Sequence, residues 1–426
     1  MRCGVVRVPE DYGKPGGRQI ELFVSVLPAR KGSNKRLAEF DLDGGPGYDA
    51  AFSAGFYLSD GEAFRRNRDL VLADQRGTGR SGALRCPAMD AYDRRRPMPP
   101  MYAPELVKEC AAALSVTADL TQYTTAASAR DIDAIRQALG YRQFSLVALS
   151  YGTTLALRYI SDFGTHVHSA VLIGTVPADR TPPRFHAIVA EQALRLVLAD
   201  CASEPTCAAA FPDIEADLGV ALARLDARDG FARSVFMEGL RTRMYSPQGM
   251  RDVPFFVHAA AGGKFAAFDA AMKPGDGERL FAQGLYLSIT CNESMARIDV
   301  DEAIGASAKT PFGAYRLERQ RAACRFWPRG PADSNLFGRG RSDVPVLFLS
   351  GAFDPVTAPQ WAAEAAAQFP NSRHIVVPRG SHVFDGLSAL DTCFDTQVLA
   401  FIDDAAPEKV DATCFNEMRG APYRTK

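Results

Sequence analysis

The chain has 426 residues, of which 47% are hydrophobic and 23% are charged, and its formal net charge is −1. This composition is typical of a globular protein, and the near-neutral charge leaves no electrostatic footprint for nucleic acid. No uninterrupted apolar run reaches the roughly 18 residues that a transmembrane helix needs. We therefore expect no nucleic-acid partner and no membrane span, in either one large domain with an insertion or two domains.

Nine cysteines are many for a protein of a reducing compartment. Eight of them fall into sequence-near pairs, Cys86/Cys110, Cys201/Cys207, Cys291/Cys324 and Cys393/Cys414, and Cys3 is left over. No pair has Cys-x-x-Cys spacing and the histidines lie elsewhere, so we predict no metal site. The pairs favour disulfides and an oxidising compartment, although buried apolar cysteines are the alternative. No signal peptide precedes the first strand-like segment, and an upstream segment with an export signal would account for Cys3.

Short apolar runs bounded by turn residues alternate with helical patterns in two parts of the chain. In chain order we predict strands at 19–29, 38–42 and 69–73, a helix at 128–139, strands at 143–149, 169–176, 344–350 and 374–377, and a helix at 396–402. This alternation predicts an α/β fold with a mostly parallel sheet flanked by helices.

The stretch 179–340 breaks that alternation, because it is rich in alanine and arginine and helical in pattern. We therefore predict a core formed by residues 1–178 and 341–426, with an inserted, mainly helical lid at 179–340. A separate helical domain without a gating role is the alternative.

Ser150 directly follows the apolar run 143–149 and precedes a helical pattern that begins at Tyr151. A serine at a sharp strand-to-helix turn is typical of a nucleophile elbow, where the turn exposes Oγ and the helix N-terminus favours a developing oxyanion. Ala148 and Gly152 supply the small flanking residues that the turn needs. Ser53 and Ser81 stand in similar short patterns but follow no apolar strand and open no helix. A structural serine without chemistry is the alternative for Ser150.

A serine nucleophile needs a base, and the base needs an orienting carboxylate. After a nucleophile elbow, the acid and then the histidine follow along the chain. His382 lies in a loop just past the last predicted strand, whereas His374 lies inside that strand. Asp354 follows the strand 344–350 at its carboxyl end, where the sites of open α/β sheets lie. We predict a Ser150–His382–Asp354 triad, with an Asx turn as the alternative for Asp354.

The run Gly44-Gly45-Pro46-Gly47 closes the strand 38–42. Consecutive glycines allow backbone amides to approach an anion, so Gly44 and Gly45, together with the amide of Tyr151, are predicted to form an oxyanion hole. An ordinary Gly-Pro turn is the alternative. The glycine-rich stretch 74–81 lacks the Gly-Lys-Ser/Thr ending of a phosphate-binding loop. We interpret it as structural, with Asp74 and Arg76 bracing the sheet edge.

Three motifs together resemble one family: Gly44-Gly45-Pro46-Gly47, Asp74-Gln75-Arg76-Gly77-x-Gly79-x-Ser81 and Ser150-Tyr151-Gly152. They are similar to the prolyl-iminopeptidase branch of the α/β-hydrolases. The cysteine layout and the C-terminal third resemble exported bacterial relatives, the tripeptidyl-aminopeptidase-like serine hydrolases. The resemblance implies an α/β-hydrolase fold with a helical lid, and hydrolysis of peptides from a free N-terminus without a cofactor. Asp43 stands where iminopeptidases have histidine, and Tyr48-Asp49 replaces a common Ser-Gly.

We therefore expect an exported serine hydrolase that forms an acyl-enzyme, most directly an aminopeptidase acting on short peptides. A bound α-ammonium in a closed site needs a carboxylate. Glu293, in Cys291-Asn292-Glu293, resembles the acidic lid position of the family and is our candidate for that role; a solvated surface glutamate is the alternative. A carboxylesterase of small acyl esters and a catalytically silent binding protein are the alternative functions, and the oligomeric state is not indicated.

Overall fold

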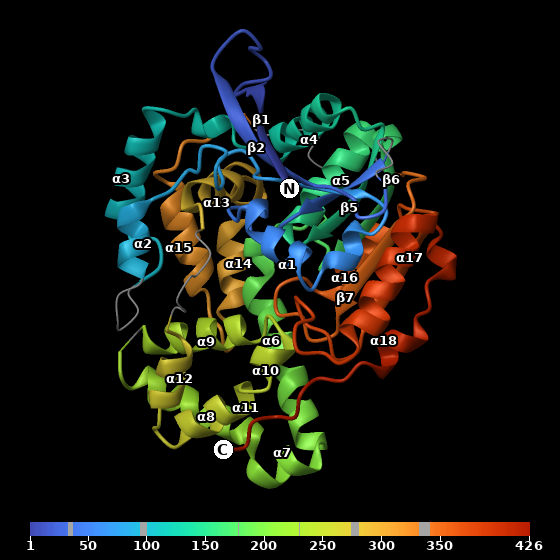
Figure 1. The fold of residues 1–426 in the computed structure, drawn as a ribbon. Helices are drawn as coiled ribbons and strands as arrows, with labels where there is room; N and C mark the ends of the chain where they lie inside the picture. The colour runs from blue at the N-terminus through green and yellow to red at the C-terminus, as the bar shows by residue number, and fades with distance from the viewer. Residues whose placement is uncertain (33–36, 94–99, 178, 230, 274–280, 332–340) are drawn as a thin grey trace.

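The computed structural model describes residues 1–426 except 33–36, 94–99, 178, 230, 274–280 and 332–340, and in the described residues eight strands form one sheet (Figure 1). The strand order is β1-β2-β4-β3-β5-β6-β7-β8. The strands are β1 (Arg2–Pro9), β2 (Gln19–Leu27), β3 (Leu37–Leu42), β4 (Asp69–Ala73), β5 (Gln143–Leu149), β6 (Val167–Ile173), β7 (Val346–Gly351) and β8 (Ser372–Val377). β2 pairs antiparallel with β1 and β4, and the remaining neighbours are parallel. The predicted mostly parallel sheet is confirmed.

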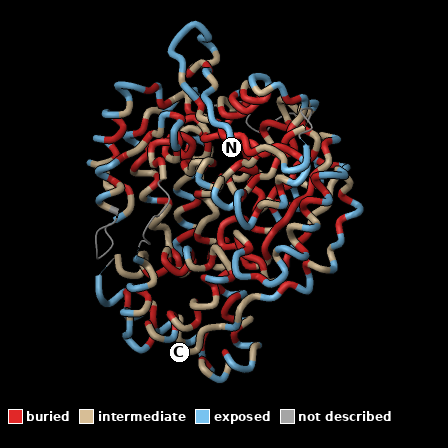
Figure 2. The backbone as a smooth tube through the Cα atoms, viewed as in Figure 1, coloured by how far each residue is buried: buried red, intermediate tan, exposed pale blue. Residues whose placement is uncertain are grey.

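Helices cover both faces of the sheet, which is why its central strands are apolar on both sides. Val346 and Phe348 of β7 face one helical layer, and Leu347 and Leu349 face the other. The first layer holds α4 (Thr125–Leu139), α5 (Tyr151–Phe163) and α16 (Pro359–Ala366), and the second holds α1 (Ala54–Leu58), α17 (Thr396–Asp404) and α18 (Thr413–Glu417). The central strands are red in Figure 2, whereas much of the β1–β2 hairpin is pale blue and exposed.

Between β6 and β7 the described chain is helical, as predicted, and the lower part of Figure 1 shows much of this region beyond the edge of the sheet. Its helices are α6 (Pro182–Ser203), α7 (Pro205–Ala210), α8 (Ile214–Asp226), α9 (Ala232–Arg243), α10 (Pro247–Met250), α11 (Val253–Ala261), α12 (Ala266–Ala271), α13 (Gln283–Ile289), α14 (Val300–Ser307) and α15 (Tyr315–Cys324). Two earlier helices, α2 (Pro87–Asp93) and α3 (Pro104–Ser115), share an apolar cluster with α13 and α15. Among the described helices, none combines the length and the apolar composition that a transmembrane span requires.

The C-terminal tail ties the helical region to the core. The Tyr423 hydroxyl donates to Asp200 Oδ2 of α6 at 2.7 Å, and the Arg424 amide donates to the Arg251 carbonyl at 3.0 Å. Four disulfides, each in a predicted pairing, add covalent links: Cys86–Cys110, Cys201–Cys207, Cys291–Cys324 and Cys393–Cys414. Cys3 is a free, exposed thiol on β1.

Two element ends differ from the sequence prediction for local reasons. The helix expected at 128–139 begins at Thr125, because the Thr124 side chain accepts a hydrogen bond from the Ala127 amide at 3.2 Å and caps it. The strand expected at 169–176 ends at Ile173, because Gly174 adopts a φ of +60°.

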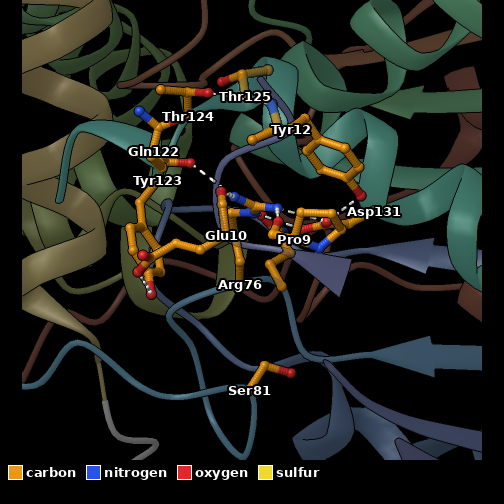
Figure 3. A network of polar contacts seen from close by, with 12 residues as sticks. Pro9, Glu10, Tyr12, Arg76, Ser81, Gln122, Tyr123, Thr124, Thr125 and Asp131 are labelled. Atoms are coloured by element: carbon orange, nitrogen blue, oxygen red, sulfur yellow. Dashed lines mark hydrogen bonds and ion pairs between the residues drawn. The ribbon is translucent and has the colours of Figure 1, made fainter. Parts of the chain in front are cut away.

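Arg76 has the structural role, bracing the sheet edge, that was predicted for the glycine-rich stretch 74–81 (Figure 3). Its side chain is fully buried and forms a two-pronged ion pair with Asp131 of α4, with Nε–Oδ2 and Nη2–Oδ1 distances of 2.7 and 2.8 Å. Nη1 also donates to the carbonyls of Glu10 and Gln122 at 2.8 and 2.9 Å. Arg76 therefore joins the end of β1, the chain before α4 and α4 itself.

Glu39 of β3 is a fully buried carboxyl group. Its nearest cation is Arg68, whose Nη1 lies 3.7 Å from Glu39 Oε2 and which also contacts Asp403. Burial, reinforced by the neighbouring Asp41, raises the pKa of Glu39 from 4.5 to about 8, although Arg68 opposes the shift. Near neutral pH the folded protein thus keeps a proton on this group that the unfolded chain releases.

This proton predicts the pH dependence of stability. Because the unfolded state binds fewer protons between pH 4.5 and about 8, the free energy of unfolding falls as pH rises through that window. Glu39→Gln removes the titration, so its stability relative to the wild type should rise by up to about 1.4 kcal/mol per pH unit and then level off. Urea unfolding from pH 4.5 to 9 measures the difference, and Glu21→Gln at an exposed position of β2 is the control. A difference that does not change with pH would contradict the prediction.

Candidate active site

Ser150 occupies a strained turn between β5 and α5. Its φ of 56° and ψ of −124° lie in a region that non-glycine residues rarely adopt. The Ser150 amide donates to the Ile173 carbonyl at 2.9 Å, and the Thr153 amide donates to the Ser150 carbonyl at 2.8 Å. A Cβ on Gly152 would lie 2.1 Å from the Leu42 carbonyl oxygen, which explains the small residue after the serine. The turn has the geometry of a nucleophile elbow.

His382 and Asp354 lie in the loops that follow β8 and β7. The distance from His382 Nδ1 to Asp354 Oδ2 is 2.9 Å, and both side chains are buried. Asp354 Oδ1 accepts from the amides of Val356 and Thr357 at 2.7 and 2.8 Å. The Asx turn and the histidine contact therefore coexist, because the two backbone amides use Oδ1, whereas Oδ2 contacts His382 and also accepts from the Thr357 hydroxyl.

Ser150 and His382 line one pocket of about 590 Å³. The imidazole is packed closely, since a Cβ on Gly174 would lie 3.3 Å from its Cε1 atom and the Tyr245 ring meets it edge-on at 5.1 Å between centroids. The sequence-predicted serine, histidine and aspartate are thus brought together at the carboxyl ends of parallel strands.

The glycine loop after β3 lies against the serine. A Cβ on Gly44 would lie 2.7 Å from Ser150 Cβ, so only glycine fits there. The expectation of three open oxyanion donors needs correction, because the Gly44 amide donates to the Asp43 carboxylate at 2.7 Å. Within the described chain, the amides of Gly45 and Tyr151 donate to no other group, which leaves these two for an oxyanion.

Glu293 lies in the pocket wall, in a π-helical turn (Thr290–Ser294) beside the Cys291–Cys324 disulfide. It is buried, and its two oxygens accept from the amide and hydroxyl of Thr125 at 2.6 and 2.7 Å. The Thr125 hydroxyl is also 3.0 Å from the Tyr151 hydroxyl. Burial, and then the Glu293 charge, raise the pKa of the Tyr151 phenol, so it stays neutral. Glu293 therefore caps the N-terminus of α4 and also faces the pocket. It is not a solvated surface glutamate, which was the alternative interpretation.

Other candidates from the sequence lie apart from this pocket. His374 Nε2 is 3.0 Å from Ser350 Oγ in the sheet. Ser81 Oγ donates to the Asp74 carbonyl at 2.7 Å, which makes it a structural residue, and neither it nor Ser53 is in the pocket lining. In the described ranges, no three His, Cys, Asp or Glu side chains group as metal ligands would.

Among the pocket residues that the sequence analysis missed are three side chains on helices of the insertion: His186 on α6, Arg241 on α9 and Arg316 on α15. Arginines on helices usually lie on a solvated face, and no local motif distinguishes these from the many others. Only the packing of the three helices brings them to one wall.

A family model described as the alpha/beta hydrolase fold matches residues 43–384, and the chain belongs to this family. Carboxylesterase B of Mycobacterium tuberculosis is 28% identical, over 95% of this chain and 85% of that protein. Serine protease Hip1 of the same species is 25% identical, over 97% of this chain and 87% of that protein. Tripeptidyl aminopeptidase of Streptomyces lividans is 24% identical, over 100% of this chain and 84% of that protein. The resemblance to tripeptidyl-aminopeptidase-like hydrolases is confirmed, and these relatives' names divide between esterase and peptidase.

Proposed function

We propose that the protein is a serine hydrolase that forms an acyl-enzyme at Ser150, most directly an aminopeptidase that releases short N-terminal units from peptides with a free α-amine. One observation carries the proposal: a serine in a positive-φ turn shares a pocket with an imidazole whose Nδ1 is held by a buried aspartate. That arrangement is the one that activates a hydroxyl for attack on a carbonyl carbon.

In the proposed reaction, Ser150 Oγ attacks the carbonyl carbon while its proton passes to His382 Nε2. Asp354 accepts the Nδ1–H bond, which keeps Nε2 unprotonated before attack and stabilises the imidazolium afterwards. The amides of Gly45 and Tyr151 stabilise the tetrahedral oxyanion, with Gly44 giving the loop its close approach to the serine. His382 then returns the proton to the leaving group, and water releases the acyl unit by the same steps.

The residues 179–340 are proposed to act as a lid over this pocket, because His186, Arg241 and Glu293 of that stretch line it together with core residues. Export is proposed from the four disulfides, which persist in oxidising compartments.

A small-ester carboxylesterase is the second candidate, favoured by the 28% identical carboxylesterase relative. A silent binding protein is disfavoured because the three triad residue types all lie at this site.

The peptide preference is tested by N-acetylation of a good substrate. If Glu293 binds the α-ammonium, acetylation should lower kcat/KM about tenfold or more, since an ionic partner in a closed site is lost. Glu293→Gln keeps an acceptor for the Thr125 amide and should abolish most of this preference while sparing ester hydrolysis. Chromogenic aminoacyl, dipeptidyl and tripeptidyl amides, with and without the acetyl group, measure it beside short-chain esters.

The exposed Glu318→Gln on α15 serves as the matched control and should leave the preference unchanged. Equal cleavage of free and acetylated substrates by the wild type would reject the aminopeptidase proposal and favour the esterase.

A further inference from the structure

The pocket wall contains more cations than carboxylates. Its described lining holds the guanidinium groups of Arg180, Arg241, Arg297 and Arg316, against the carboxylates of Asp43 and Glu293. A concave cationic site attracts and holds anionic ligands, because its walls limit the water that screens the charge there.

Two of these cations, Arg241 and Arg316, are held in place by a shared carboxylate. Both flank the carboxylate of Glu238, with Oε2 lying 3.2 Å from Arg241 Nε and 3.5 Å from Arg316 Nη1. Although burial opposes ionisation, the two guanidinium groups hold the pKa of Glu238 below its usual value. One negative charge therefore faces two positive charges, and the trio carries a net charge of +1.

His186 does not alter this balance. Burial, and then the charges of Arg316 and Arg241, lower its pKa well below the usual value, so the imidazole is neutral. Its Nδ1 atom and Arg316 Nε are buried and have no hydrogen-bond partner among the described residues. Buried polar atoms in native proteins are normally satisfied, and an unmade bond there is costly. These two atoms are therefore open to a bound group.

The cluster is connected to the histidine side of the site. Arg241 Nη1 donates to the Tyr245 hydroxyl at 3.0 Å, and the Tyr245 ring packs edge-on against His382. Glu293, by contrast, is joined through Thr125 to Tyr151, next to the serine. The pocket thus has an acidic group beside Tyr151 and a basic cluster toward His382.

We propose that Arg316 and Arg241 form a subsite for a carboxylate, and that the substrates of this enzyme carry such a group on the part that lies toward His382. That the bound ligand is a substrate rests on the proposed hydrolase function, whereas the binding of a carboxylate at this site does not depend on it. A planar guanidinium fork matches a carboxylate, and the hydrogen bonds are strengthened by charge. Short acidic peptides and half-esters of dicarboxylic acids share this chemistry.

Turnover tests the subsite with matched peptide amides and esters that carry glutamate or glutamine. The wild type should prefer the acidic member, and Arg316→Gln should lower the ratio of acidic to neutral kcat/KM about tenfold or more, the loss expected for one charge-assisted hydrogen bond. Arg321→Gln removes a charge from the surface of the same helix, where Arg321 pairs with Asp301, and should leave the ratio unchanged.

Calorimetric binding measurements test the carboxylate subsite without turnover. Glutarate should bind Ser150→Ala protein in calorimetry and glutaramide should not, and Ser150→Ala/Arg316→Gln should lose glutarate binding. Glutarate binding without hydrolysis of any substrate would reject the hydrolase proposal and keep the subsite. Ser150-dependent hydrolysis with no acidic preference and no glutarate binding would overturn the subsite and keep the hydrolase. Because the wild type and Ser150→Ala alone decide these outcomes, the test holds even if Arg316→Gln does not fold.

Discussion

Ser150→Ala and His382→Ala should each lower kcat by about 10⁶-fold, because members of such a triad act as a unit. Without Oγ no acyl-enzyme can form, and without the imidazole Oγ has no group to accept its proton. A fluorophosphonate probe should label the wild type once, at Ser150, and should not label either variant. Steady-state kinetics on the amide and ester panel, with mass mapping of the labelled peptide, measures both effects.

Ser53→Ala is the matched control, since Ser53 stands in a similar short pattern but lies outside the pocket lining. It should retain full activity and labelling. Labelling at Ser53 or Ser81, or full activity in Ser150→Ala, would show that the nucleophile has been misassigned.

Asp354→Asn should lower kcat by about 10⁴-fold while the protein stays folded. The amides of Val356 and Thr357 both donate to Oδ1, so the amide oxygen of the new side chain takes that position. Its NH₂ group then faces His382 Nδ1, which in the wild type lies 2.9 Å from Oδ2. Nδ1 must accept this bond, so the ring proton moves to Nε2, which can no longer receive the proton of Ser150.

Nitrogen NMR of His382 distinguishes this mechanism from a general loss of structure, because the resonances should report a proton on Nε2 in the variant and on Nδ1 in the wild type. Asp301→Asn makes the same chemical change on the surface of α14 and should affect neither activity nor tautomer. Retention of more than about a tenth of wild-type activity in Asp354→Asn would mean that another group orients the imidazole.

Much of this fold follows from short-range signals in the sequence. The apolar runs that became β5 and β7 are bounded by turn residues, and a parallel sheet necessarily brings the loops after its strands to one edge. That constraint is why Ser150, Asp354 and His382 could be grouped from their order alone, although Ser150 lies more than 200 residues before the other two. The cysteine pairs were equally readable, because each partner lies within a few tens of residues of the other.

Other features depend on packing that no local pattern encodes. The bond from the Gly44 amide to Asp43 depends on a side-chain rotamer, and it removes a donor that the glycine motif had predicted. The contact of Glu293 with Thr125 joins positions 168 residues apart and gives the glutamate a capping role that its own segment does not reveal. The basic cluster of the pocket comes from three helices, with Arg241, Arg316 and His186. In sequence, these positions cannot be distinguished from the solvent-exposed positions of the same helices. Helix packing alone turns them inward, because the period of 3.6 residues fixes which side chains share a helix face, and only the neighbouring helices decide which face is buried.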